Sequence, residues 1–264
     1  MTYNISHEWY TKDIPIVGVI DCLRIKVEFK ADWINDCRTE QIEYEMLPNY
    51  VQDDKYDIGE GHEYPGSEDR RKRLSLASRN IWQVGWYLPP YKFPSSPNYH
   101  IITNHILKNK NHIFEEKYAK YLAYAMYHKA EKYKFGIFDA DFIVPVPNYD
   151  LNNDAYAVSI SKQLYEIMKY EGHNVKFQNL LIKTQDLKTH KMNWMEKEKF
   201  YSENKLYEFR EDLAGMGYLR GKKIILVDDV VTQGYAAEQC LKALSNQGAD
   251  DLCFYSVGTT KRKR

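Results

Sequence analysis

KKIILVDDVVTQGYAAEQCL, residues 222–241, is the stretch of sequence that decides the fold. Its four apolar residues at 224–227 are too few for a helix and end at two carboxylates, which is typical of a buried parallel strand. After Asp228 and Asp229 comes a short turn around Gly234, and apolar residues then recur at helical spacing until Gly248. The stretch predicts a strand, an acidic pair, a glycine turn and a helix, at the edge where open α/β sheets bind ligands.

This order of elements suits recognition of a phosphorylated sugar. The first turn of a helix offers free N–H groups and a partial positive charge, and a glycine lets the backbone approach a phosphate closely. The neighbouring carboxylates repel a phosphate, so their natural partners are hydroxyl groups or a cation on the same ligand. A ribose 5-phosphate supplies both the phosphate and the hydroxyl groups.

Residues 224–236, IILVDDVVTQGYA, resemble the phosphoribosyl-pyrophosphate (PRPP) signature of type I phosphoribosyltransferases. The resemblance implies that Asp228 and Asp229 are the catalytic pair that holds the ribose hydroxyls and that the following loop wraps the 5-phosphate. It assigns PRPP binding to these two acids and to Val231, Thr232, Gln233, Gly234, Tyr235 and Ala236. Family loops usually have small hydroxyl residues where this chain has Gln233 and Ala236, so side-chain donors are altered while backbone donors remain.

Two other interpretations fit the same stretch less well. One is an ordinary strand and helix whose acidic pair is solvated at the strand end. The other is the Walker B strand of a nucleotide triphosphatase, which needs a Walker A loop after an earlier strand. The nearest candidate, GMGYLRGK at 215–222, has the wrong glycine spacing and precedes the strand, so the sequence argues against this class of protein.

Composition limits the classes of protein to consider. A chain of 264 residues can bury a large core, and predicts one large domain with an appendage or two modest domains. Lysine plus arginine equals aspartate plus glutamate, 37 each, so global charge indicates neither a nucleic-acid nor a membrane partner. No run of about 18 apolar residues occurs, and the start lacks the basic and apolar regions of a signal peptide, which predicts a cytoplasmic protein.

The amino-terminal part, residues 1–98, is predicted to be a separate module of uncertain fold. The β-branched run at 14–29 indicates one or two strands, and the acidic, glycine-rich segment at 52–65 indicates a loop. Residues 70–86 begin with Arg70-Arg-Lys-Arg73 and continue with apolar residues, which predicts a helix with a basic beginning. Four prolines between 89 and 97 then form a linker or crossing segment.

Residues 99–264 are predicted to form an α/β domain. Apolar residues from 105 onward fall on one face of a helix that runs to about Lys132. The sequence FIVPVP at 142–147 predicts a short strand, which either ends at Pro145 or lies where its N–H groups have no hydrogen-bond partner in a neighbouring strand. A further helix runs to Gly172 before the signature strand. This alternation predicts a mainly parallel, twisted sheet with helices on both faces, the type I phosphoribosyltransferase fold, plus a divergent amino-terminal β-containing module.

The order of motifs from about residue 100 to 260 resembles that of ComF-like phosphoribosyltransferases. The segments that carry this resemblance are, in chain order, 105–110, 144–147, 184–190 and the PRPP signature at 224–236. The resemblance implies a pyrophosphate loop at 148–153 and a mobile hood at 183–200. It assigns contacts with pyrophosphate to Asn148, Tyr149, Lys188, His190 and Lys191. ComF-like proteins usually carry an arginine in the pyrophosphate loop, and this chain has none there.

Zinc is not expected. ComF-like proteins commonly begin with a four-cysteine zinc ribbon, whereas the amino-terminal half of this chain has only Cys22 and Cys37. The other cysteines are Cys240 and Cys253, and no two of the four form a Cys-x-x-Cys pair. We therefore interpret all four as structural thiols.

The resemblance implies a pentosyltransferase, a glycosyltransferase that moves phosphoribosyl from PRPP to an acceptor that the sequence does not identify. Mg²⁺ is the expected cofactor, held indirectly by Asp228 and Asp229, and a homodimer is a possible assembly. One alternative is a catalytically degenerate PRPP- or nucleotide-sensing module. Another is an effector that acts with nucleic acid in competence or antiviral defence, for which the basic clusters at 70–73 and 261–264 are the sequence support.

Overall fold

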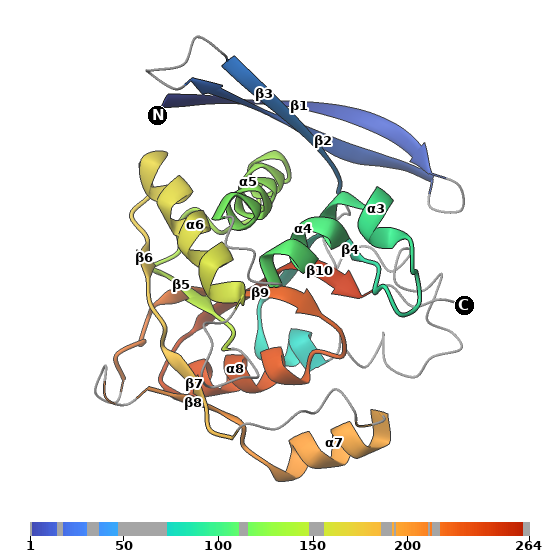
Figure 1. Ribbon diagram of the computed structural model, residues 1–264. Helices are drawn as coiled ribbons and strands as arrows, with labels where there is room; N and C mark the ends of the chain where they lie inside the picture. Colours follow the sequence, from blue (N-terminus) through green and yellow to red (C-terminus); the bar gives the residue numbers. More distant parts are fainter. Residues whose placement is uncertain are drawn as a thin grey trace.

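The computed structural model describes residues 2–14, 18–30, 37–46, 73–110, 116–147, 156–185, 192, 194–210, 212 and 217–260. The chain forms four layers, which are an antiparallel sheet, a layer of helices, a parallel sheet and a second layer of helices (Figure 1). Among these residues, no helix is both long enough and apolar enough to cross a lipid bilayer.

The central sheet is parallel throughout. It consists of β4 (Asn80–Tyr87), β5 (Phe142–Pro145), β6 (Lys176–Phe177), β9 (Lys223–Val231) and β10 (Asp251–Thr260), in the order β4-β10-β9-β5-β6. The strands β9 and β10 lie in the middle and are buried on both faces, which explains their nearly continuous apolar sequence. The predicted α/β class with a parallel sheet is confirmed, and β5 ends at its proline as expected.

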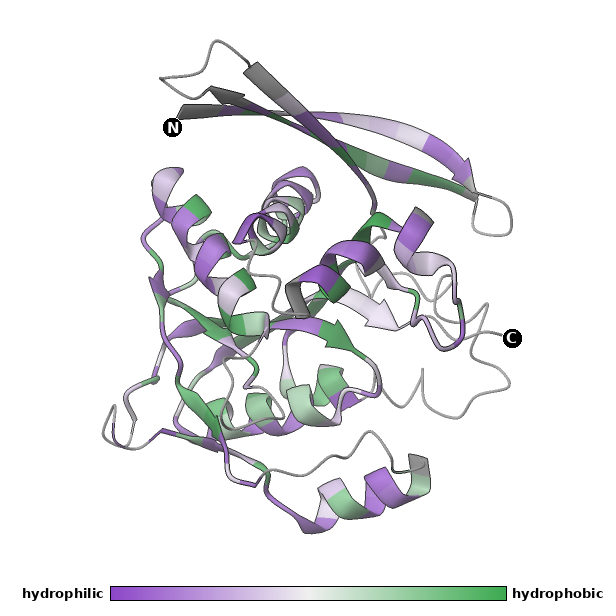
Figure 2. Ribbon diagram, in the orientation of Figure 1, coloured by the Kyte–Doolittle hydropathy of each residue, from purple (hydrophilic) through white to green (hydrophobic). Residues whose placement is uncertain are grey.

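Helices cover both faces of this sheet. The helices α4 (Ile101–Lys110), α5 (Glu116–Lys132) and α6 (Tyr156–Tyr170) pack on one face, and α8 (Tyr235–Asn246) packs on the other (Figure 1). In Figure 2 these helices show hydrophobic and hydrophilic residues side by side, as expected when one side of each is buried. The short α3 (Ser96–Tyr99) precedes α4.

The antiparallel sheet consists of β1 (Thr2–Ile14), β2 (Gly18–Lys30) and β3 (Cys37–Glu45), in that order. One or two strands were expected over 14–29; that run contributes the end of β1 and most of β2, and β3 is additional. Along β2 the buried Leu23, Ile25 and Val27 alternate with more exposed charged residues, so one face is apolar. This face joins α4, α5 and the central sheet in one continuous cluster of buried side chains, which we call the inter-sheet core.

The segment 73–87 differs from the prediction. Only residues 73–77 are helical, and Ile81, Trp82 and Trp86 lie on β4, so the expectation of a helix through these residues is wrong. The apolar run was misread because β4 is buried on both faces, and periodicity does not separate such a strand from a buried helix. Since β4 pairs with β10, the central sheet draws on residues before the expected domain boundary at 98 and 99.

A small two-stranded unit flanks α8. The strands β7 (Leu181–Lys183) and β8 (Tyr207–Phe209) pair antiparallel, and α7 (Trp194–Glu203) lies between them in the sequence. Their buried residues join the side chains of α8 and of the facing side of the central sheet in a second cluster, the α8 core. The described thiols of Cys22, Cys240 and Cys253 are free and buried.

Candidate functional site

A cleft of about 500 Å³, part of it open to solvent, lies where β9 ends and α8 begins. Two segments that are separate in sequence form its walls, the end of β9 with the turn into α8, and one side of α7. The lining residues are Asp228, Val230, Val231, Thr232, Gln233, Gly234, Tyr235, Ala236 and Ala237, together with Lys197 and Tyr201 of α7. The cleft therefore occupies the carboxyl edge of the sheet, where ligands of parallel α/β sheets bind.

The turn into α8 depends on Gly234. This residue is the N-cap of the helix and adopts φ 80° and ψ 0°, a left-handed conformation that costs other residues about 1–2 kcal/mol. Its carbonyl accepts the first helical hydrogen bond, from the N–H of Glu238 at 2.8 Å. The N–H groups of the preceding residues of the first turn have no acceptor within the helix and belong to the cleft wall. The cleft thus contains the positive end of a helix dipole.

The two acids of the signature lie in different surroundings. Asp228 lines the cleft, whereas Asp229 is 8% exposed and is absent from the cleft lining. Val227 belongs to the inter-sheet core and Val230 packs against the same core, although residues three apart in a regular strand face opposite ways. The alternation of β9 is therefore broken at the acidic pair.

Each of these carboxylates accepts a hydrogen bond from the next backbone N–H. Asp228 Oδ1 accepts from Asp229 N at 2.9 Å, and Asp229 Oδ1 accepts from Val230 N at 2.7 Å. Such local bonds satisfy backbone donors where the strand departs from its regular ladder. The two acids point in different directions because adjacent residues of a strand face opposite sides of the sheet.

The carboxylate of Asp228 lies close to two buried weak acids. Burial raises the pKa of the Cys240 thiol, and the negative charge of Asp228 raises it further. Burial also raises the pKa of Tyr207, with further contributions from Cys240, Tyr201 and Asp228. Both groups are neutral at physiological pH, so neither adds a negative charge beside Asp228.

Arg73, from a distant part of the sequence, contacts two residues that line the cleft. Its guanidinium carbon lies 4.0 Å from the centre of the Tyr235 ring, and its Nε donates a hydrogen bond to the Gln233 carbonyl oxygen at 3.4 Å. It also approaches Glu238 at 4.0 Å, and its side chain is 15% exposed. In the sequence, Arg73 is only the end of a basic cluster, and its partner Gln233 is 160 positions away.

The helix α7 is tethered to α8 beside the cleft. Gln239 donates hydrogen bonds to the carbonyl oxygens of Tyr201 and Asn204, at 2.9 and 2.8 Å. The rings of Tyr201 and Tyr235 stack with centroids 5.0 Å apart and planes 6° apart. These contacts hold Lys197 and Tyr201 at the cleft, and their spacing of four along a helix places them on one face.

The predicted site residues have different outcomes. All the predicted PRPP-binding residues except Asp229 line the one cleft. The predicted pyrophosphate and hood residues lie outside the described part of the chain: Asn148, Tyr149, Lys188, His190 and Lys191. Arg73 and Tyr201 were not predicted as part of the site, and Lys197 falls within the predicted hood at 183–200 without having been singled out.

Comparison of the sequence with protein-family models gives no match, and comparison with curated proteins gives none. Among solved structures, the chain is similar to a protein described as the allosteric regulatory enzyme of purine biosynthesis, with a TM-score of 0.32 and 17% sequence identity. The similarity covers 52% of this chain and 25% of the other, so this chain matches a quarter of that protein's length. A likeness of this extent does not bear on activity, which must be argued from the cleft.

Proposed function

We propose that the cleft binds a phosphorylated ribose, PRPP or ribose 5-phosphate, together with Mg²⁺, and that the protein is a phosphoribosyltransferase-like protein of the type I fold. The observation that supports this most directly is that Asp228 and the glycine-led start of α8 line the same cleft. A phosphate and a sugar hydroxyl on one ligand need both features within a few ångströms of each other.

The phosphate would bind at the turn into α8. The first-turn amides of α8, the left-handed Gly234 and the helix dipole all favour an anion there. Arg73 lies against the same turn and Lys197 lines the cleft, so two side-chain cations add to the backbone donors. Because residues 233 and 236 carry no hydroxyl group, the hydrogen bonds from these two positions to the phosphate would come from the backbone N–H groups.

The sugar would bind at the end of β9. Asp228 faces the cleft and can accept hydrogen bonds from ribose hydroxyls. A carboxylate beside a polyphosphate is also the donor set that Mg²⁺ prefers, so Asp228 fits the ion when the ligand's phosphates provide further oxygens. Magnesium held there would supply positive charge to the pyrophosphate.

In the transfer reaction, the bond between ribose C1 and the pyrophosphate oxygen breaks, and a bond from C1 to a nucleophilic atom of the acceptor forms. Negative charge then grows on the departing pyrophosphate, and cations fixed nearby lower the barrier. Lys197 lines the cleft, and Arg73 contacts Gln233 and Tyr235 of its lining. Their part would be to hold the departing anion, while Asp228 positions the ribose.

A second candidate is a module that binds PRPP or a nucleotide without turnover. The observation that favours it is the burial of Asp229, since a single acid at the cleft gives fewer contacts with the sugar diol. A nucleic-acid effector receives less support, because Arg73 packs against Tyr235 instead of standing on an open basic surface. Residues 70–72 and 261–264 lie outside the described part of the chain.

The test is titration of the protein with PRPP in the presence of Mg²⁺, by calorimetry and by thermal unfolding. At a hundredfold excess over the dissociation constant, bound PRPP should stabilise the protein by about 2.7 kcal/mol. Asp228→Asn should weaken binding about tenfold or more with little change in the unliganded midpoint. Asp251→Asn is the matched control, because Asp251 begins β10 at the opposite edge of the sheet.

The outcome decides between the candidates. Release of pyrophosphate with a nucleobase acceptor would support transfer, whereas binding without release across candidate bases would support the sensing module. If the folded protein shows no stabilisation by PRPP, or if Asp228→Asn and Asp251→Asn bind it equally well, the proposed site is wrong.

A further inference from the structure

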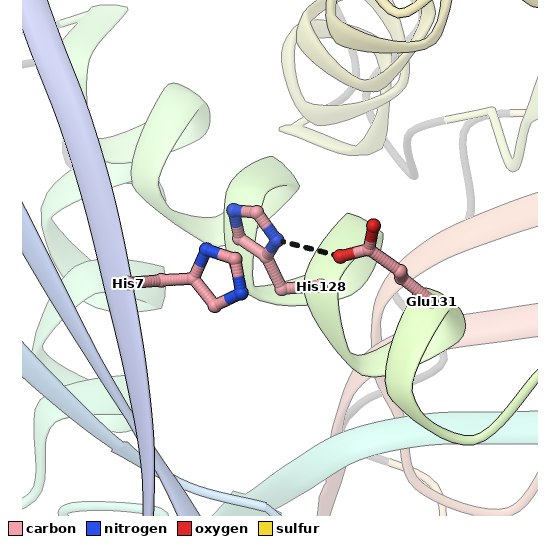
Figure 3. Close-up of side chains that lie close together, drawn as sticks. All are labelled: His7, His128 and Glu131. Atoms are coloured by element: carbon pink, nitrogen blue, oxygen red, sulfur yellow. Dashed lines mark hydrogen bonds and ion pairs between the residues drawn. The ribbon is translucent and has the colours of Figure 1, made fainter.

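We infer that His7, His128 and Glu131, here called the imidazole cluster, form a binding site for a transition-metal ion of the Zn²⁺ type. His7 lies on β1, and His128 and Glu131 lie on α5, so the three side chains come from two layers of the molecule (Figure 3). The site is separate from the proposed phosphoribosyl cleft and does not depend on it.

The geometry of the cluster suits one ion. One potential ligand atom from each residue lies within 4.8 Å of the others. His128 Nδ1 and Glu131 Oε2 are 3.3 Å apart, and the ligand atoms of a tetrahedral Zn²⁺ site are about 3.3–3.6 Å apart. His7 must move by about 1 Å to complete this spacing, and it can do so because it is exposed on an edge strand.

The arrangement of the two rings also points to a ligand. The imidazole rings of His7 and His128 stack with centroids 3.8 Å apart and planes 26° apart. The stacking brings nitrogen atoms of both rings into one small volume, as binding to a single ion requires.

The helix presents its two ligands together. His128 and Glu131 are three positions apart on α5, which places both side chains on one face of the helix. Around His128, the rings of Tyr124 and Tyr127 lie 6.0 and 5.5 Å away by centroid and wall off one side of the cluster. These rings limit the movement of the His128 imidazole, while the other side of the cluster stays open to solvent.

The chemistry of the donors selects the class of ion. Two imidazoles and one carboxylate suit Zn²⁺, Co²⁺ or Ni²⁺, whereas Mg²⁺ and Ca²⁺ prefer oxygen ligands alone. Three protein ligands leave a fourth position for water or another small ligand. Because the ligands join β1 to α5, the ion would fasten the antiparallel sheet to the helices above the central sheet.

The experiment titrates metal-free full-length protein with Zn²⁺ by calorimetry and with Co²⁺ by visible absorption. One equivalent should bind, Co²⁺ should give the absorption of an ordered four-coordinate site, and excess Zn²⁺ should raise the unfolding midpoint by about 5 °C. A chelator should reverse the shift. Hydrogen exchange should slow on β1 when Zn²⁺ is added, which distinguishes a bridging ion from an ion bound on α5 alone.

Two variants test the ligands and one serves as control. His7→Gln and Glu131→Gln change exposed side chains, so both should fold, and each should weaken Zn²⁺ binding at least tenfold and abolish the slowed exchange on β1. His173→Gln is the control, because His173 contacts the ring of Tyr127 but is not in the cluster. If the wild-type protein binds neither ion, or if His7→Gln and Glu131→Gln bind as tightly as His173→Gln, the inference is overturned.

Discussion

The cleft and the interface between the two sheets are assembled in opposite ways. All residues that line the cleft, apart from the two on α7, fall within ten consecutive positions, 228–237. At the interface, polar partners come from far apart, since Tyr44 meets His105 from 61 positions away and Glu40 meets Tyr121 from 81. The first site is therefore a property of a local segment, and the second exists only in the folded chain.

The interface is also the more heavily buried of the two regions. Lys129 is fully buried there, with its ammonium group donating to the Val84 carbonyl oxygen at 3.0 Å, and burial lowers its pKa. Tyr255 donates to the Met126 carbonyl oxygen at 2.7 Å in the same core. The cleft, in contrast, is partly open to solvent, and ring stacking of Tyr201 on Tyr235 helps to hold its α7 wall. We therefore expect changes at the interface to act on stability and changes at the cleft to act on binding.

The largest effect should follow from Ile25→Ala. Ile25 is fully buried in β2 and belongs to the inter-sheet core, so removing most of its side chain should lower the free energy of unfolding by about 3 kcal/mol. Because this core is continuous with the central sheet, urea denaturation followed by circular dichroism should show a single transition. Lys26→Ala, at the exposed neighbouring position, should cost less than about 0.5 kcal/mol. Two separate transitions would show that the antiparallel sheet is an independent unit.

Acid should weaken the interface next most strongly. Burial lowers the pKa of both His105 and His128 to about 4, so between pH 6.5 and 4 the unfolded chain binds more protons than the folded protein. The free energy of unfolding should therefore decrease as the pH is lowered through this window, by about 2 kcal/mol in total from pH 7 to pH 5.5. Urea titrations at the two pH values measure it. His105→Gln should remove roughly half of the difference, and an unchanged pH dependence in this variant would contradict the assignment to His105.

The same contrast explains how much the sequence predicts. The strand, glycine turn and helix over 223–246 follow from local chemistry, because an apolar run, Gly234 and helical spacing each act on their own neighbours. The parallel sheet follows from the alternation of such units. The different directions of Asp228 and Asp229 also follow, because adjacent residues of a strand face opposite sides of the sheet. The break in alternation that places Val230 on the same side as Val227 does not follow from the sequence.

Non-local contacts account for most of what the sequence does not predict. Arg73 reads as part of a solvated basic cluster until the folded chain brings it to Tyr235. His7 and His128 are two isolated histidines in the sequence and come together only when β1 packs on α5. The strand β4 was mistaken for a helix because double-sided burial erases the period-2 signal. Each of these features needs the tertiary arrangement to become visible.

A smaller effect on stability, with a selective effect on binding, is expected for Gly234→Ala. Alanine at φ 80° is strained, which should cost about 1 kcal/mol, and the displaced turn should weaken PRPP binding about tenfold. Gly217→Ala is the matched control, because Gly217 has φ 82° and open space around it, so it should cost a similar stability and leave binding unchanged. Thermal unfolding and calorimetry measure the two quantities. Equal binding by both variants would remove the turn from the proposed site.

The smallest effect should come from Arg73→Lys. This residue is distant in sequence from the local segment that lines the cleft, but contacts it in the folded protein. Lysine keeps the charge but loses the planar contact with Tyr235 and the Nε bond to Gln233, so stability should fall by about 0.5 kcal/mol and PRPP affinity about threefold. The control is Arg79→Lys, whose side chain is 70% exposed and pairs with Asp251 away from the cleft. If calorimetry gives the same affinity for both variants, Arg73 shapes only the outside of the turn. The contacts of Arg73 with Tyr235 and Gln233 would then make no contribution to PRPP binding, which would leave Lys197 as the non-local cation at the cleft.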